Sequence, residues 1–301
     1  MTETRSPSDP AWIGAVLGGH RVVGELATGG MGTVLRAEHV LLGRPAAIKV
    51  LRADLSRHRE LIRRFVTEAQ AVTACRHPGI VEVFDFGYTD EGHAYIVMEL
   101  LTGEPLGRRL ARSRLDEAVA VELTAGLASA LRAAHRVGVI HRDLKPDNIF
   151  LVRDPDTGGE RPKILDFGIA KLIGPDHAAP HTQTGALIGT PLYMAPEQAR
   201  AAAAIDGRAD LYSLGCILYH MVVGRPPFVA DGAGELIAMQ LFGHADAPSR
   251  HAPVSAALDE VVARLLEKDP ARRYPSAGEL VDALAAIRAA APPPAPPPPP
   301  A

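Results

Sequence analysis

Residues 141–148 read His141-Arg142-Asp143-Leu144-Lys145-Pro146-Asp147-Asn148, and this row of residues is the most specific motif in the chain. It lies between a long predicted helix and a short apolar strand at Ile149 to Val152. One loop thereby offers a carboxylate that can take or orient a hydroxyl proton, a lysine that can contact a phosphoryl group, and an amide oxygen for a metal. A polar loop with a purely structural role would not need this order of residues.

A second acidic position follows at Asp166-Phe167-Gly168. The carboxylate of Asp166 is a hard oxygen ligand of the kind that suits magnesium when the ion bridges phosphates. Such a tripeptide is common by chance, and its position downstream of the loop at 141–148 gives it weight.

The glycine-rich turn from Ala27 to Val34 lies between two predicted strands, where small residues would let backbone amides approach phosphate oxygens closely. Glycine turns in hairpins are also common for steric reasons. This segment alone is therefore a weak signal, and the later motifs decide how it is interpreted.

Lys49 ends the apolar run Ala46-Ala47-Ile48, where an ammonium without a partner would be costly. Glu68, on the helix predicted to follow, is the best placed carboxylate, and an ion pair between the two would present the ammonium to phosphates. The alternative is a surface lysine that extends its ammonium into water beside an unrelated glutamate.

Composition and charge narrow the class of protein. The 301 residues are 47% hydrophobic and 22% charged, as in ordinary soluble globular proteins, and the net charge of -3 argues against nucleic acid as the main partner. Cys75 and Cys216 lie far apart without a CxxC motif, which favours a reducing cytoplasm over a disulfide or zinc scaffold. The longest apolar stretch, Leu211 to Val223, is too short for a membrane span.

The apolar periodicity predicts an α+β protein. Alternating residues between Val22 and Leu51 favour three antiparallel strands, a helix is expected over Arg59 to Arg76, and the runs Ile80 to Phe86 and Ala94 to Leu100 complete a five-stranded sheet. The rest of the chain is mainly helical. The predicted helices cover Asp116 to Val137, Arg208 to Val223, Glu235 to Phe242, Ser255 to Leu266 and Ser276 to Ala289, the last with a capping box formed by Ser276 and Glu279.

Taken together, these motifs resemble the signature set of the protein kinase family, from about Val22 to Ala289, including Ala195-Pro196-Glu197 at the end of an activation segment that begins at Asp166. The resemblance implies a bilobal fold, with a small five-stranded antiparallel β lobe that carries one helix and a larger, mainly α lobe. The expected parts are a disordered leader at 1–19, a kinase domain at 20–290 with lobes at 20–101 and 102–290, and a proline-rich polyproline tail at 291–301.

The resemblance also implies a Ser/Thr protein kinase that uses ATP with Mg²⁺, or Mn²⁺ in its place, on protein substrates in signalling. Asp143 is then the catalytic base, Lys145 contacts phosphate, Lys49 and Glu68 form the strand-helix pair, and Asn148 and Asp166 bind the metal. The implied nucleotide-binding residues are Ala27, Thr28, Gly29, Gly30, Met31, Gly32, Val34, Ala47, Lys49, Met98, Glu99, Leu101 and Phe150. The implied structural residues are His141, Arg142, Phe167, Gly168, Glu197, Asp210 and Arg273.

The glycine loop and the segment around Thr182-Gln183-Thr184 are similar to those of bacterial receptor-type Ser/Thr kinases. That similarity implies autophosphorylation on Thr182 or Thr184, where a phosphate would pair with Arg142, and it implies a homodimer.

Two alternatives stay open at this stage. Ala27 stands where the family usually has its first glycine, and if that position needs positive φ, strain of order 1 kcal/mol would weaken nucleotide binding. One alternative, which rests mainly on Ala27, is a pseudokinase that has the fold and binds partners but does not transfer phosphate. A small-molecule phosphotransferase is the other, although such enzymes generally lack the complete segment that ends at Glu197.

Overall fold

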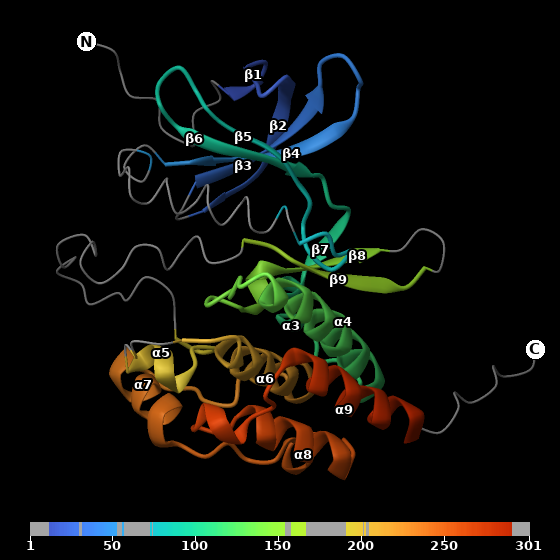
Figure 1. Ribbon diagram of the computed structural model, residues 1–301, viewed down its shortest axis with the longest axis vertical. Helices are drawn as coiled ribbons and strands as arrows, with labels where there is room; N and C mark the ends of the chain where they lie inside the picture. The colour runs from blue at the N-terminus through green and yellow to red at the C-terminus, as the bar shows by residue number, and fades with distance from the viewer. Residues whose placement is uncertain are drawn as a thin grey trace, which may run out of the picture. The chain divides into compact units, whose positions relative to one another are not determined.

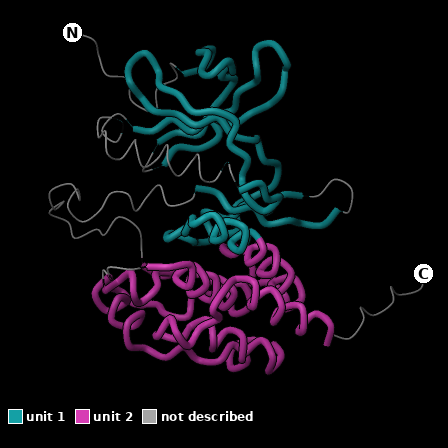
Figure 2. Tube along the Cα trace, in the orientation of Figure 1, with its two compact units in different colours: residues 1–109, 130–190 teal, residues 110–129, 191–301 magenta. Residues whose placement is uncertain are grey.

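The computed structural model describes residues 12–29, 32–52, 56, 73, 75–153, 158–166, 191–200, 202 and 205–290. The chain divides into two compact units, shown in teal and magenta in Figure 2. Unit 1 comprises residues 1–109 and 130–190, and unit 2 comprises residues 110–129 and 191–301. Unit 1 therefore extends past the predicted boundary at 101, and the predicted lobe limits stay a prediction.

A six-stranded antiparallel sheet forms the first part of unit 1 (Figure 1), with the strand order β1-β2-β3-β4-β6-β5. Its strands are β1 (Val16–Leu17), β2 (His20–Gly29), β3 (Gly32–His39), β4 (Pro45–Leu51), β5 (Val83–Tyr88) and β6 (Ala94–Glu99). Five of them match the predicted runs. The sixth, β1, has two residues and pairs with the start of β2, which is too short a segment for sequence periodicity to reveal.

The two faces of this sheet serve different purposes. One face buries an apolar cluster that includes Leu35, Ile48 and Val97, which lie opposite one another on β3, β4 and β6. Each fully buried aliphatic side chain of this kind contributes about 1.5–3 kcal/mol to folding. Residues one position along each strand point to the opposite face, and Lys49 is among them.

A three-stranded sheet follows in unit 1, made of β7 (Gly103–Pro105), β8 (Ile149–Arg153) and β9 (Glu160–Ile164). The sequence predicted only β8. Ile80, which precedes β5, forms an isolated parallel bridge with Ile164 at the end of β9, so the two sheets are joined by backbone hydrogen bonds.

Helices make up most of the remaining described chain (Figure 1), and α4 contributes residues to both units (Figure 2). The helices are α3 (Leu106–Leu110), α4 (Glu117–Arg136), α5 (Pro196–Ala199), α6 (Arg208–Val223), α7 (Ala233–Phe242), α8 (Ala256–Leu265) and α9 (Ala277–Ala290). The five predicted helices in this region are confirmed to within two residues at each end. Among the described helices, none combines the length and apolar content that crossing a bilayer requires.

Helix ends in unit 2 follow their capping residues. Ser255 caps α8 by accepting a hydrogen bond from Leu258 N, and Gly224 ends α6 in the left-handed conformation with φ of 89°. The predicted capping box of α9 is seen in part, because Ser276 Oγ accepts from Glu279 N at 3.4 Å.

A buried ion pair fixes the core of unit 2. Arg273 is fully buried and donates two hydrogen bonds to the Glu197 carboxylate, at 2.7 and 2.8 Å. Its remaining donors reach the backbone carbonyls of Glu267 and Arg208. The guanidinium thus connects α5 to the first residue of α6 and to the segment after α8, and the structure brings together Glu197 and Arg273, two of the residues predicted to be structural.

We predict that Arg273→Met lowers the free energy of unfolding by about 3 kcal/mol, because the buried Glu197 carboxylate loses its counter-ion. Urea unfolding followed by circular dichroism measures this change. The matched control is Arg272→Met, since Arg272 is exposed and its pair with Glu267 contributes little, so its unfolding free energy should change by less than about 0.5 kcal/mol. Equal effects of the two substitutions would refute the role given to the pair.

Candidate active site

The loop at 141–148 holds its polar side chains in one small cluster within unit 1. Lys145 Nζ donates to Asp143 Oδ2 at 2.8 Å, and Asn148 Nδ2 donates to the Asp143 backbone carbonyl at 2.8 Å. A short 3-10 turn over Pro146–Asn148 leads directly into β8. Because the turn begins with a proline and ends in a strand, the positions of Asp143 and Asn148 are fixed relative to the hairpin.

His141 anchors this loop to the end of β9. Its ring is fully buried, its Nδ1 accepts from Asp143 N at 3.3 Å, and its Nε2 donates to Leu165 O at 3.0 Å. Leu165 N in turn donates to Asn148 O at 2.8 Å. Both ring nitrogens are engaged by backbone groups, so His141 connects the loop to Leu165, the residue before Asp166.

The backbone is strained at two points of this cluster. Arg142 and Asp166 have φ of 64° and 45°, and among the described residues they are the only non-glycine residues with positive φ. A left-handed conformation costs an ordinary residue about 1–2 kcal/mol, and such strain concentrates at functional sites. In this cluster the left-handed conformation orients the backbone at Arg142 and at Asp166, and neither position is a glycine.

Lys49 reaches this cluster from the first sheet. Its Nζ donates to Asp166 Oδ2 at 2.6 Å, and the lysine side chain is 8% exposed. Glu68, the partner predicted from sequence, lies outside the described residues. The structure therefore supplies the anionic partner that a buried ammonium needs, from the carboxylate of Asp166.

The sheet face that carries Lys49 also presents most of the predicted nucleotide residues that the structure describes. Val34 lies opposite Lys49, and Ala47, two residues before Lys49, lies opposite Met98. Directly paired residues share a face of an antiparallel sheet. Val34, Ala47, Lys49 and Met98 are thus on one face, which forms an apolar surface next to a cation.

The hairpin turn between β2 and β3 depends on one glycine. Gly32 has φ of 154°, and a Cβ there would lie 2.0 Å from the Val50 carbonyl oxygen. Ala27 pairs with Val34 within the hairpin and does not have positive φ, so the strain considered for it does not arise. Thr28 and Gly29 end β2, whereas Gly30 and Met31 lie outside the described residues.

A link behind Met98 was not predicted from the sequence. Glu99 Oε1 accepts hydrogen bonds from Lys163 Nζ and, at 2.8 Å, from Glu82 N, so β6 is joined to β9 and to the segment before β5. The available signal was a lysine in an otherwise apolar strand end, three residues before Asp166. Pairing over 64 positions of sequence could not be read from periodicity.

The donor atoms fit a magnesium ion. Asn148 uses its Nδ2 for the Asp143 carbonyl, which leaves its Oδ1 to face a cation, and Asp166 uses one carboxylate oxygen for Lys49 and keeps the other. Hard oxygens in this number are typical of Mg²⁺ sites that are completed by phosphate oxygens. Asn148 and Asp166 would hold the ion.

The other predicted site residues fall into two groups. Phe167, Gly168, Thr182 and Thr184 lie outside the described residues. The remaining ones are in the structure, but their predicted roles are untested: Leu101 follows β6, Phe150 lies in β8, Arg142 lies in the loop, and Glu197, Asp210 and Arg273 lie in unit 2.

Comparisons with known proteins agree with this geometry. Residues 20–283 match the protein kinase domain family. The chain is 45% identical over 275 residues to the Ser/Thr-protein kinase Pkn1 of Myxococcus xanthus, covering 90% of this chain and 38% of that protein. It is 43% identical over 285 residues to PknA of Mycobacterium tuberculosis, covering 92% of this chain and 63% of that protein.

The solved kinase domain of PknI from Mycobacterium tuberculosis has the same fold, with a TM-score of 0.72, 30% identity, and coverage of 92% of this chain and 98% of that one. The chain spans less than two thirds of the length of Pkn1 and PknA. Family match, identity and fold coincide on the segment that carries the cluster around Asp143. This chain belongs to the protein kinase family.

Proposed function

We propose that this chain transfers the γ-phosphoryl group of ATP to serine and threonine hydroxyls of proteins, as part of signal transduction. The observation that carries the proposal is the juxtaposition of Asp143, Asn148 and Asp166 by the hydrogen bonds of His141 and Leu165. A carboxylate that could act as the base and two side chains whose oxygens could bind a metal thus lie near one end of one hairpin. Phosphoryl transfer needs this combination, because positioning and charge stabilisation supply most of its catalysis.

Asp143 would orient the acceptor hydroxyl and receive its proton. The hydroxyl oxygen forms a new bond to the γ-phosphorus while the bond from that phosphorus to the bridging oxygen breaks, and ADP leaves with the bonding electrons. Magnesium bound with the nucleotide supplies neutralisation of the phosphate charge. The hydrogen bond from Asn148 to the Asp143 carbonyl holds the base against its loop.

Lys145 and Lys49 would neutralise different parts of the phosphate charge. Lys145, which lies 2.8 Å from Asp143, can turn to the transferred phosphoryl group once a substrate hydroxyl replaces it at the carboxylate. Lys49 has the position expected of a cation that contacts the nucleotide phosphates, on the same face as Val34 and Ala47. Those apolar residues suit the adenine ring.

We extend the proposal to the activation segment, which would be phosphorylated by the chain itself on Thr182 or Thr184. Arg142, next to the base and in a left-handed conformation, is the cation expected to pair with that phosphate. The expected homodimer, the cytoplasmic location and the identity of the protein substrates stay predictions.

We predict that Asp143→Asn reduces phosphate transfer about a thousand-fold while nucleotide affinity changes little, because only the proton acceptor is lost. Transfer of radiolabelled phosphate to an unstructured Ser- and Thr-rich protein measures the rate. Asp147→Asn is the matched control, since it makes the same chemical change at an exposed position of the same loop, and its rate should stay within about threefold. Comparable rates for the two variants would remove Asp143 from the mechanism.

Autophosphorylation makes a separate prediction. Mass spectrometry of the chain expressed in cells that lack other Ser/Thr kinases should find phosphate on Thr182 or Thr184, and none on the Asp143→Asn variant. Arg142→Gln should keep the sites modifiable but lower the gain in activity that phosphorylation gives, because the charge-assisted pair is lost. Phosphate on the inactive variant would show that another enzyme is responsible.

A further inference from the structure

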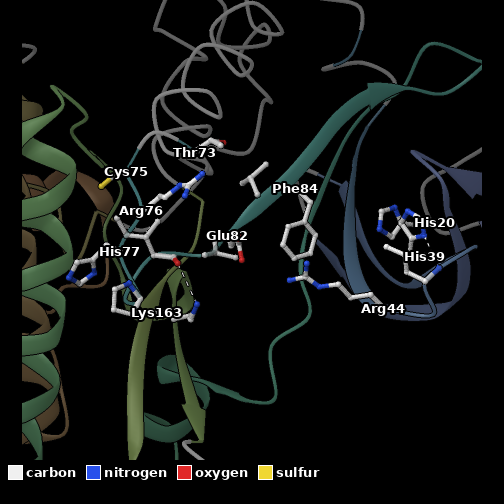
Figure 3. A pocket seen from close by; sticks show the side chains of 15 residues that line it. His20, His39, Arg44, Thr73, Cys75, Arg76, His77, Glu82, Phe84 and Lys163 are labelled. Carbon is white, nitrogen blue, oxygen red and sulfur yellow. Dashed lines mark hydrogen bonds between the residues drawn. The ribbon is translucent and has the colours of Figure 1, made fainter.

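A pocket of about 760 Å³ opens in unit 1 among residues that the proposed chemistry does not use as base or metal ligand. Its lining comes from Thr73, from most of residues 75–84, from His39, Leu42 and Arg44 around the turn between β3 and β4, from His20 at the start of β2 and from Lys163 of β9 (Figure 3). A volume of this size accommodates a drug-sized molecule or a few residues of a peptide.

Two arginines line the pocket without a carboxylate partner in the described part of the chain. The Arg44 guanidinium stacks over the Phe84 ring at 4.3 Å from its centroid, and Arg76 is exposed. Figure 3 shows them on opposite sides, with Phe84 and Glu82 between them. The guanidinium groups of Arg44 and Arg76 are therefore separated from each other, and each can bind one carboxylate.

The side near Arg76 is electropositive beyond that residue alone. Burial lowers the pKa of His77, and the nearby charges of Arg132, Arg136 and Lys163 lower it further. Lys163 is itself engaged with Glu99, and Glu82 is the one carboxylate among the lining residues that the structure describes. An anion entering here would find more cations than carboxylates.

The side near Arg44 offers imidazole rings. His39 accepts hydrogen bonds from Leu41 N and Leu42 N at its Nδ1, and His20 packs edge to face on it with ring centroids 4.9 Å apart. His20 is buried and its Nδ1 donates to Gly18 O at 2.7 Å, so the half-buried ring of His39 is the more accessible of the two. No acidic side chain lines this side of the pocket among the described residues.

Apolar side chains lie between the two cationic sides, next to Glu82. Phe84, Val83 and Pro78 line the pocket, and Leu42 at its margin is 76% exposed. Next to it, Leu41 is 87% exposed. Leucines this exposed at a turn leave apolar area that a partner can cover.

We propose that this pocket binds an acidic peptide segment of a protein partner, with carboxylates at two positions that flank one or two apolar residues. A small inorganic anion could meet one arginine only, whereas a peptide can meet Arg44 and Arg76 together and place an apolar side chain on Phe84. The charge complementarity selects an acidic occupant, and the apolar middle selects a peptide over a simple anion.

Isothermal titration calorimetry of the whole 301-residue chain with the acetylated peptide Asp-Asp-Leu-Leu-Asp-Asp, in 50 mM NaCl without ATP, tests the proposal. The peptide contains no hydroxyl side chain, so it cannot act as a phosphorylation substrate. The dissociation constant of the acidic peptide should lie below about 1 mM. The affinity should decrease several-fold at 300 mM NaCl, and it should be at least tenfold lower for the amide peptide Asn-Asn-Leu-Leu-Asn-Asn.

The double variant Arg44→Gln, Arg76→Gln should bind the acidic peptide at least tenfold more weakly. Arg288→Ala is the control, since this exposed arginine lies in α9 of unit 2, and it should leave the affinity within twofold. Thermal melting checks that the variants fold. Arg76→Gln alone, at an exposed position, should weaken binding about threefold or more and keeps the test decisive if the double variant unfolds.

Five results would overturn the proposal. Four of them are equal binding of the acidic and amide peptides, an unchanged affinity in the folded arginine variants, displacement of the peptide by saturating ADP with magnesium, and displacement by 10 mM inorganic phosphate at matched ionic strength. Displacement by ADP would place the peptide in the nucleotide site, and displacement by phosphate would identify a simple anion site. Loss of peptide binding on self-association of the chain would instead make a second copy the occupant, against the proposal.

Discussion

The contact between Lys49 and Asp166 is the constraint on which the site depends. An ammonium that is 8% exposed on a central strand cannot stay without a counter-ion, and the carboxylate at 2.6 Å comes from the end of a different sheet. The sheet that presents Val34 and Ala47 is thus joined to the segment that presents the metal-binding oxygen. Together with the bridge between Ile80 and Ile164, this pair fixes the apolar face relative to the polar cluster.

Hydrogen bonds of Leu165 connect Asp166 to the loop that contains Asp143. Leu165, next to Asp166, donates to Asn148 and accepts from His141, and both partners belong to the loop that holds Asp143. Every link is a short-range contact with a buried or backbone group, so none depends on a long exposed side chain. Arg142 and Asp166 have positive φ, which non-glycine residues disfavour, so at these two positions the network outweighs the backbone preference of the residue.

The sequence revealed the elements whose signal is local, and the structure added those whose signal is not. Helices α4 and α6 follow from apolar periodicity and caps, and the loop around Asp143 follows from its order of residues. The sequence did not reveal β9, because Glu160–Ile164 reads Glu-Arg-Pro-Lys-Ile and becomes a strand only through pairing with β8. The same reason hid the pair of Lys163 with Glu99, because partners 64 positions apart leave no periodic trace.

The net charge can be read from the sequence, whereas the environment of each charged side chain is known only from the fold. A net charge of -3 over the chain argues against a broad positive field, yet unit 1 separates its cations into two environments. Lys49 and Lys145 are paired with carboxylates at 2.6 and 2.8 Å, in positions where a phosphate compound would compete for them. Arg44 and Arg76 have no such carboxylate partner among the described residues, although Glu82 lines the same pocket. A cation already paired favours ligands that can displace its partner, such as a nucleotide phosphate, whereas an unpaired cation at an exposed pocket can hold weaker anions such as carboxylates.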